Sequence, residues 1–211
     1  MVVPLGLDLE PFARCEEHGD AFRREFNVTA DEILIGIVAR LVPVKDIPNF
    51  LAAAKQVCAQ IPNARFVIVG DGELRVALEA EARELSLGDR VIFAGYRRDL
   101  SRIYAGLDLV VLSSLNEGLP VSLIEAMASA KVAISTSVGG VPNLLTEGET
   151  GFLCPPADPK ALAEKIVVVI SQRDRWAEIG DKARQYALSR YNIDRLVTDI
   201  ERLYADTHTR G

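Results

Sequence analysis

NEGLPVSLIEAMASA, residues 116–130, predicts a loop followed by a helix, and the rest of the fold is organised around that helix. Pro120 suits the first helical position, where a backbone N–H has no partner to lose and φ is already fixed. The residues after it are apolar nearly all round, as in a helix buried on every side. Glu125 is the exception, because a buried carboxylate is costly unless another group pairs with it. No Lys or Arg lies three or four residues away, so we expect its partner to come from elsewhere in the fold or from a ligand.

Composition places the chain among ordinary globular proteins. It has 211 residues, of which 49% are hydrophobic and 26% charged, and its formal net charge is −6. Acidic and basic residues are intermixed, so the charge pattern does not indicate nucleic acid as a partner. Cys15, Cys58 and Cys154 are too far apart to suggest a disulfide framework or a metal site. Without a signal peptide or an apolar run of membrane-spanning length, we expect a cytoplasmic protein.

Short apolar runs alternate with helical patterns on both sides of the opening stretch. Residues 33–41, ILIGIVARL, form a continuous run rich in β-branched side chains, which is typical of a strand buried in a parallel sheet. Further strands are predicted at 64–69, 91–94, 107–113, 132–135 and 151–154, after the end of a strand at 2–8. Helices are predicted at 46–61, 73–85, 99–105, 141–145, 158–172, 173–191 and 193–208, after an amphipathic segment at 11–26.

Alternation of this kind predicts an α/β fold in which right-handed crossovers build a parallel sheet covered by helices on both faces. We therefore expect a doubly wound, Rossmann-like domain over residues 1–211, with a helical tail from about residue 173. Asp46 and Asp158 are expected to cap the helices that follow them.

Ligands of such sheets bind at the carboxyl ends of the strands. The residues that follow the predicted strands, and would meet at that rim, are Arg40, 70–72, Gly95-Tyr96, Asn116-Glu117 and Gly139-Gly140.

Cations and carboxylates are both present at this rim. Arg40 and Lys45 suit a phosphate or diphosphate, and the N–H groups beside Pro120 add the positive end of a helix dipole. Glu117 and Glu125 are good acceptors for neighbouring hydroxyls. Phosphate and polyol together indicate a nucleotide, a sugar phosphate or a nucleotide sugar. On spacing alone, Arg40, Lys45 and Glu117 fit ordinary surface charges equally well.

Six blocks of sequence, in order, give a more specific indication of the family. They are PLGLD at 4–8, ARLVPVKD at 39–46, VIVGDGE at 67–73, VIFAGYRRDL at 91–100, LDLVVLSSLNEGLPVSLIEAMA at 107–128 and GGVPNLLTEGETGFLCPPAD at 139–158. The chain resembles, over residues 4–204, the C-terminal domain of retaining GT-B glycosyltransferases of the large family called glycosyl transferases group 1. Glu117 and Glu125 form the E-x7-E pair of that family, which alone would be a weak pattern.

The resemblance implies a role for each residue of the predicted site. Arg40 and Lys45 would hold the donor diphosphate, and Glu125 would accept hydrogen bonds from the ribose hydroxyls. Glu117 would face the donor sugar, with a catalytic role by positioning and electrostatics. The further donor contacts implied are Gly95, Tyr96, Gly118, Leu119 and Val121. Transfer would proceed with retention, and the resemblance implies neither a cofactor nor a metal ion.

Three positions depart from the family pattern. Ala39 and Asp46 stand where glycine is common, and Asn143 stands where glutamate is usual. Asp46 would either weaken the attraction of Lys45 for phosphate or cap the next helix, and we favour the cap.

The resemblance covers one half of a two-domain enzyme. GT-B enzymes bind the acceptor on an N-terminal domain, which we expect to be missing here, so the expected partners are a nucleotide diphosphate sugar and that domain. Half a cleft neither holds both substrates nor excludes water, and we predict at most feeble donor hydrolysis by this chain alone. The whole enzyme would be cytoplasmic or peripheral at the inner face of the membrane. The apolar residues of the last helix would then be partly exposed and favour a homodimer: Ile193, Leu196, Val197, Ile200 and Leu203.

Two alternatives stay open. The chain could be a nucleotide-binding or interaction module without turnover, or an epimerase acting on nucleotide sugars with the same fold. The E-x7-E spacing and the pair of Arg40 and Lys45 argue against the epimerase.

Overall fold

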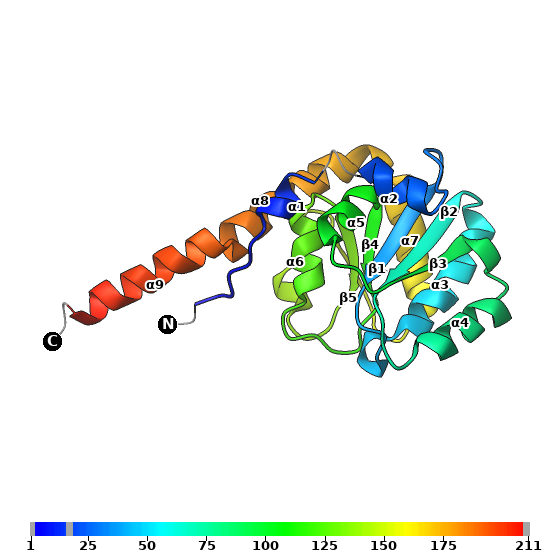
Figure 1. The fold of residues 1–211 in the computed structure, drawn as a ribbon, viewed down its shortest axis with the longest axis horizontal. Coiled ribbons are helices and arrows are strands. Elements are labelled where there is room, and N and C mark those ends of the chain that lie inside the picture. The colour runs from blue at the N-terminus through cyan, green and yellow to red at the C-terminus, as the bar shows by residue number, and fades with distance from the viewer. Residues whose placement is uncertain (1–2, 16–18, 209–211) are drawn as a thin grey trace.

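Six parallel strands form one sheet in the computed structural model, which describes residues 3–15 and 19–208 (Figure 1). The strand order is β3-β2-β1-β4-β5-β6, and every neighbouring pair is parallel. The order reverses between β1 and β4, which is where open α/β sheets bind their ligands. The strands are β1 (Ile33–Val38), β2 (Ala64–Val69), β3 (Val91–Gly95), β4 (Leu109–Leu112), β5 (Val132–Thr136) and β6 (Phe152–Cys154). The predicted α/β, Rossmann-like fold is confirmed.

Helices cover both faces of the sheet (Figure 1). One face packs against α3 (Ile47–Gln60), α4 (Arg75–Glu84) and α7 (Pro159–Ser171). The other packs against α2 (Gly19–Glu25), α5 (Leu100–Gly106) and α6 (Val121–Ala128), with the short α1 (Glu10–Ala13) beside them. Helix α8 (Trp176–Tyr191) begins against the face covered by α3 and α7 and ends against the face covered by α6. Helix α9 (Ile193–His208) follows it. Single 3-10 turns lie at Pro43–Lys45, Gly88–Arg90, Val141–Asn143 and Arg173–Arg175.

Alternation along β1 explains why its sequence is apolar throughout. Ile35 and Ile37 belong to the cluster under α3, where Phe50 and Phe66 pack edge to face with ring centroids 5.5 Å apart. Leu34 belongs to the opposite cluster, beneath α5. Both faces of the strand are therefore buried, and each such side chain contributes about 1.5–3 kcal/mol when fully buried.

The helix predicted from the opening stretch is α6, but it is shorter than expected. Pro120 lies just before it, with an extended ψ of 102°, so it is the N-cap and not the first helical residue. Ala130 has a φ of 52°, and the helix already ends at Ala128. The prediction of a buried helix is confirmed for its central residues, which are Leu123, Ile124, Ala126, Met127 and Ala128.

The two predicted aspartate caps have opposite outcomes. Asp158 caps α7, since its Oδ1 accepts a hydrogen bond from the Ala161 N–H at 2.9 Å. Asp46 precedes α3 but its side chain makes no capping hydrogen bond, so that prediction is wrong. The Asp46 backbone is left-handed, with a φ of 46°. Glycine adopts this conformation freely and aspartate tolerates it. This explains why glycine is common at this position in the family that the chain resembles.

The first described residues lie against the junction of α8 and α9. Leu7 forms a single bridge with Asn192, where a strand end was expected, and its N–H donates to the Tyr191 carbonyl at 2.7 Å. The Val2 end of that prediction lies outside the described residues. Helix α9 then extends away from the body (Figure 1). Of the five apolar residues predicted to be partly exposed, Ile193, Val197, Ile200 and Leu203 are each 39–50% exposed, and Leu196 is half-buried. The homodimer stays a prediction.

None of the helices in the described residues is both long and apolar enough to cross a bilayer.

Candidate functional site

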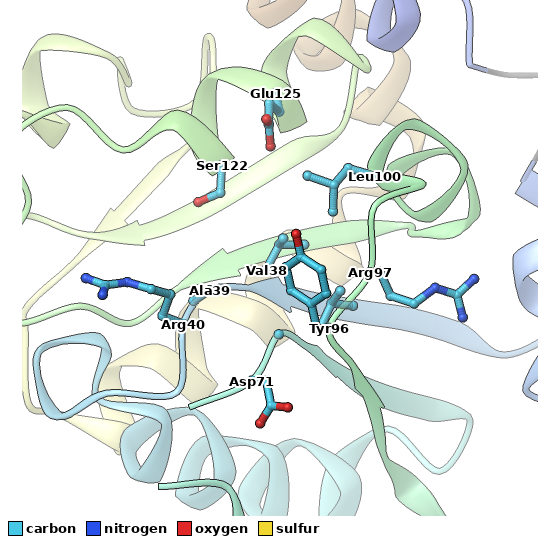
Figure 2. Close-up of a pocket in the computed structure, with 11 residues that line it drawn as sticks. Val38, Ala39, Arg40, Asp71, Tyr96, Arg97, Leu100, Ser122 and Glu125 are labelled. Carbon is cyan, nitrogen blue, oxygen red and sulfur yellow. The ribbon is translucent and has the colours of Figure 1, made fainter. Parts of the chain in front are cut away.

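A cavity of about 250 Å³ opens at the carboxyl ends of β1 and β2, beside α6 (Figure 2). Three of the predicted site residues line it: Arg40 after β1, Tyr96 after β3 and Glu125 on α6. The remaining lining residues, most of which the sequence did not indicate, are Val38, Ala39, Val69, Gly70, Asp71, Arg97, Leu100 and Ser122.

Glu125 points from α6 toward this cavity (Figure 2). Burial raises the pKa of its carboxyl group, and a hydrogen bond from Tyr104 opposes that rise. The Tyr104 hydroxyl lies 3.1 Å from Glu125 Oε2. The partner expected from elsewhere in the fold is therefore Tyr104, on α5. Sequence analysis missed it, although a tyrosine in a core helix needs an acceptor for its hydroxyl.

Tyr96 and Arg97 follow β3 and differ in orientation. The Tyr96 side chain is 69% exposed, and its ring lies over the cavity (Figure 2). Arg97 turns away from the cavity and pairs with Glu25 and Asp99. Its two hydrogen bonds to Asp99, both 2.8 Å long, hold the pKa of that carboxyl at about 2. The Arg97 charge is thus neutralised before any ligand arrives.

Gly95 and Arg40 are both near the cavity but contribute differently. Gly95 is not among the lining residues, and its carbonyl accepts a hydrogen bond from the Gly70 N–H at 2.9 Å. Arg40 is exposed and extends along the rim (Figure 2), and no ion pair of the described residues involves it. Its charge is therefore available to an anion.

Lys45 and Glu117 form a second centre, which does not line the cavity of Figure 2. Lys45 Nζ lies 2.6 Å from Glu117 Oε1, and the Ser114 hydroxyl donates to the same oxygen at 2.6 Å. Glu117 is only 9% exposed. The Ser113 hydroxyl in turn donates to the Lys45 carbonyl at 2.9 Å. The sequence indicated both charges but not their pairing, because they stand far apart in the chain.

The loop that carries Glu117 rests on the Gly139-Gly140 turn. The Gly140 N–H donates to the Glu117 carbonyl at 2.9 Å. A Cβ atom at Gly139, whose φ is 51°, would lie 1.8 Å from that same carbonyl oxygen. Only glycine allows this approach together with this backbone conformation, so the turn fixes the position of the loop that carries Glu117.

The N-terminus of α6 completes the rim. Gly118, Leu119 and Val121 are exposed, with Leu119 and Val121 each at 37%. Within residues 3–15 and 19–208, no group accepts a hydrogen bond from the N–H of Val121 or Ser122. Free N–H groups at the positive end of a helix dipole favour an anion.

Asn143, one of the departures from the family pattern, lies in the 3-10 turn Val141–Asn143. Its backbone carbonyl accepts a hydrogen bond from the Tyr186 hydroxyl at 2.8 Å.

Comparisons with known proteins place this arrangement in context. Residues 19–186 match the family described as glycosyl transferases group 1. Among curated proteins, UDP-Gal:alpha-D-GlcNAc-diphosphoundecaprenol alpha-1,3-galactosyltransferase of Escherichia coli is 32% identical over 97% of this chain and 54% of its own length.

Two solved structures are similar over most of the chain. Anabaena HepE in complex with UDP-glucose is 26% identical, with a TM-score of 0.89 over 98% of this chain and 57% of that one. The C-terminal domain of the group 1 glycosyl transferase LpcC from Francisella tularensis is 26% identical, with a TM-score of 0.79 over 89% of this chain and all of that one. The chain spans about half the length of the curated relatives it matches.

Proposed function

Because the chain belongs to the glycosyl transferases group 1 family, we propose that it is the donor-binding part of a retaining glycosyltransferase. The donor would be a UDP-, GDP- or ADP-sugar, from which a hexosyl group is transferred to an acceptor. The similarity to HepE, whose structure contains UDP-glucose, supports a nucleotide sugar as the donor.

The observation that carries this proposal is the setting of Glu125. Its carboxyl group is partly buried, points into the cavity and has one oxygen, Oε2, engaged by Tyr104. Within the described part of the chain no group donates to the other oxygen, Oε1. An unshared carboxylate oxygen in a cavity suits a ligand with neighbouring hydroxyls, as a ribose has. The exposed face of Tyr96 would lie against the base.

The diphosphate would lie between the cavity and the second centre. Arg40 and the free N–H groups of Val121 and Ser122 supply positive charge on that side, and Lys45, which pairs with Glu117, has two further N–H donors. These groups would stabilise the negative charge that develops on the leaving diphosphate, without a metal ion. Contacts from Gly95, Gly118 and Leu119 belong to the same proposal.

Glu117 would act on the donor sugar by positioning and electrostatics. Its pairing with Lys45 and Ser114 through Oε1 leaves Oε2 for the substrate. A carboxylate near the anomeric carbon stabilises positive charge as the glycosidic bond breaks with retention.

We place the chain in the C-terminal half of such an enzyme. Its match to all of the C-terminal domain of LpcC, and to about half of the curated relatives, supports this placement. Transfer would then need the other half, which holds the acceptor and excludes water. Residues 1–211 alone should therefore bind donor but hydrolyse UDP-glucose only feebly.

Calorimetry with UDP, GDP and ADP tests the proposal. We expect one of the three to bind, with binding lost in Glu125→Ala and kept in Glu164→Ala, which removes an exposed carboxylate on α7. Absence of binding by all three nucleotides would refute a donor site. Binding of one of them, with no transfer by a longer chain that includes an acceptor domain, would instead favour a module without turnover.

A further inference from the structure

Helix α5 connects two sides of the proposed nucleoside cavity. Leu100, in its first turn, lines the cavity. Tyr104 lies four residues later, on the same face of the helix, and its hydroxyl reaches Glu125 on α6. One rigid element therefore forms part of the wall and also contacts the carboxyl group that faces the ligand.

The position of Tyr104 is fixed by packing. Its side chain is completely buried, and its ring meets Phe12 edge to face with centroids 5.8 Å apart. Helix α5 itself is anchored to α2, since Arg102 donates to the Ala21 carbonyl at 3.0 Å and pairs with Glu25. The hydroxyl consequently has little freedom to follow Glu125 if that side chain moves.

One proton on the Tyr104 hydroxyl faces two acceptors. Glu125 Oε2 lies at 3.1 Å and the Ser122 carbonyl oxygen at 2.9 Å. A tyrosine donates only one hydrogen bond. Ser122 is inside α6, where its carbonyl also accepts from the N–H four residues later. The carboxylate has no such second donor among the described residues, so donation to Glu125 satisfies more of the buried polar groups.

From this geometry we infer that Tyr104 is a positioning residue that holds the Glu125 carboxylate for the ribose hydroxyls. The inference rests on the proposed function of Glu125. Oε2 is held by Tyr104, Oε1 is left toward the cavity, and the side chain is kept in one rotamer. Without the hydroxyl, the Glu125 side chain would turn freely, and a ribose nucleotide would no longer bind more tightly than its deoxyribose form.

The test compares UDP, GDP and ADP with their 2′-deoxy and 3′-deoxy forms by calorimetry on the full chain. For the nucleotide that binds wild type, we expect the ribose form to be favoured by about tenfold, the value of a hydrogen bond to a charged group. Tyr104→Phe should reduce that preference to about threefold or less, and Glu125→Gln should do the same. The double variant should lose no more than either single variant, because the two groups act as one unit.

A matched control separates positioning from the general loss of a tyrosine hydroxyl. Tyr186→Phe also removes a hydroxyl that donates to a backbone carbonyl, that of Asn143 at 2.8 Å, but outside the cavity. It should leave the ribose preference unchanged. Should Tyr104→Phe impair folding, 3-fluorotyrosine at position 104 keeps the hydroxyl and makes it a stronger donor, so the preference should rise.

The outcomes distinguish the two proposals. Wild type that binds none of the nucleotides refutes the donor site and, with it, this inference. Wild type that prefers the ribose form, together with a Tyr104→Phe variant of equal preference, refutes only the role of Tyr104.

Discussion

The close contact between the Gly139-Gly140 turn and the Glu117 loop predicts a large cost for Gly139→Ala. The new Cβ would lie 1.8 Å from the Glu117 carbonyl oxygen, more than 1 Å inside the closest approach that Cβ atoms make. Alanine would also have to adopt the left-handed φ of 51°, which costs about 1–2 kcal/mol. The loop must therefore move away from the turn.

The magnitude follows from what that movement disturbs. The hydrogen bond from the Gly140 N–H to the Glu117 carbonyl contributes about 0.5–1.5 kcal/mol. Displacement of Glu117 also weakens its buried pairing with Lys45 and Ser114. We expect a total loss of about 3–5 kcal/mol in the free energy of unfolding, which for a chain of this size lowers Tm by roughly 6–20 °C.

Two other glycines provide controls in the same urea and thermal unfolding assay. Gly148 has a φ of 73° but no atom within 4 Å of an added Cβ, so Gly148→Ala measures backbone strain alone, about 1–2 kcal/mol. Gly118 has neither positive φ nor a nearby atom, and Gly118→Ala should change stability by less than about 0.5 kcal/mol. If Gly139→Ala costs no more than Gly148→Ala, the contact does not fix the loop and the reasoning fails.

Three further sets of substitutions test other contacts. Glu125→Gln should unfold at a higher temperature than wild type at pH 8. Burial raises the pKa of Glu125 above its value in the unfolded chain, so wild type loses stability as pH rises through the folded pKa, whereas the neutral glutamine does not. No difference is expected at pH 4, and a variant less stable than wild type at pH 8 would contradict this. Lys45→Ala and Glu117→Ala should each lower the free energy of unfolding by about 2–4 kcal/mol, measured by urea unfolding. The double variant should lose well below the sum of the two; additive losses would show that the pair is not coupled. Asp158→Ala should lower the free energy of unfolding by about 1 kcal/mol, because the capping hydrogen bond is lost. Asp46→Gly should not lower stability, since Asp46 has positive φ and makes no capping hydrogen bond. Equal losses in the two variants would restore a capping role for Asp46.

Elements with strong apolar patterns could be predicted from the sequence. The strand β2, at 64–69, was predicted to the residue, because both faces of this strand are buried and polar residues mark its ends. Helix ends were less accurate, as for Pro120, which stands one position before the helix it was expected to open. A proline fixes its own φ, but ψ depends on the loop before it, and that loop is set by contact with Gly139 and Gly140.

The candidate site was predictable in its residues but not in its pairing. The unpartnered carboxylate of Glu125 in an apolar helix correctly signalled a contact from another part of the fold. Tyr104 could not be identified as that contact, because the side chains meet only when α5 and α6 pack together. The pairing of Lys45 with Glu117 could not be predicted for the same reason, since loops after different strands bring the two side chains together.

The contact between the first described residues and the last helices makes them one cooperative unit. The Leu7 N–H donates to Tyr191, the Ile193 N–H donates to Leu7 at 2.9 Å, and the Arg195 guanidinium donates to the carbonyls of Pro4 and Leu5. Opening of this segment breaks these bonds together and frees the start of α9. The amides of Leu7 and Ile193 should therefore exchange with solvent deuterium at matching rates, more slowly than a frayed terminus and faster than β1.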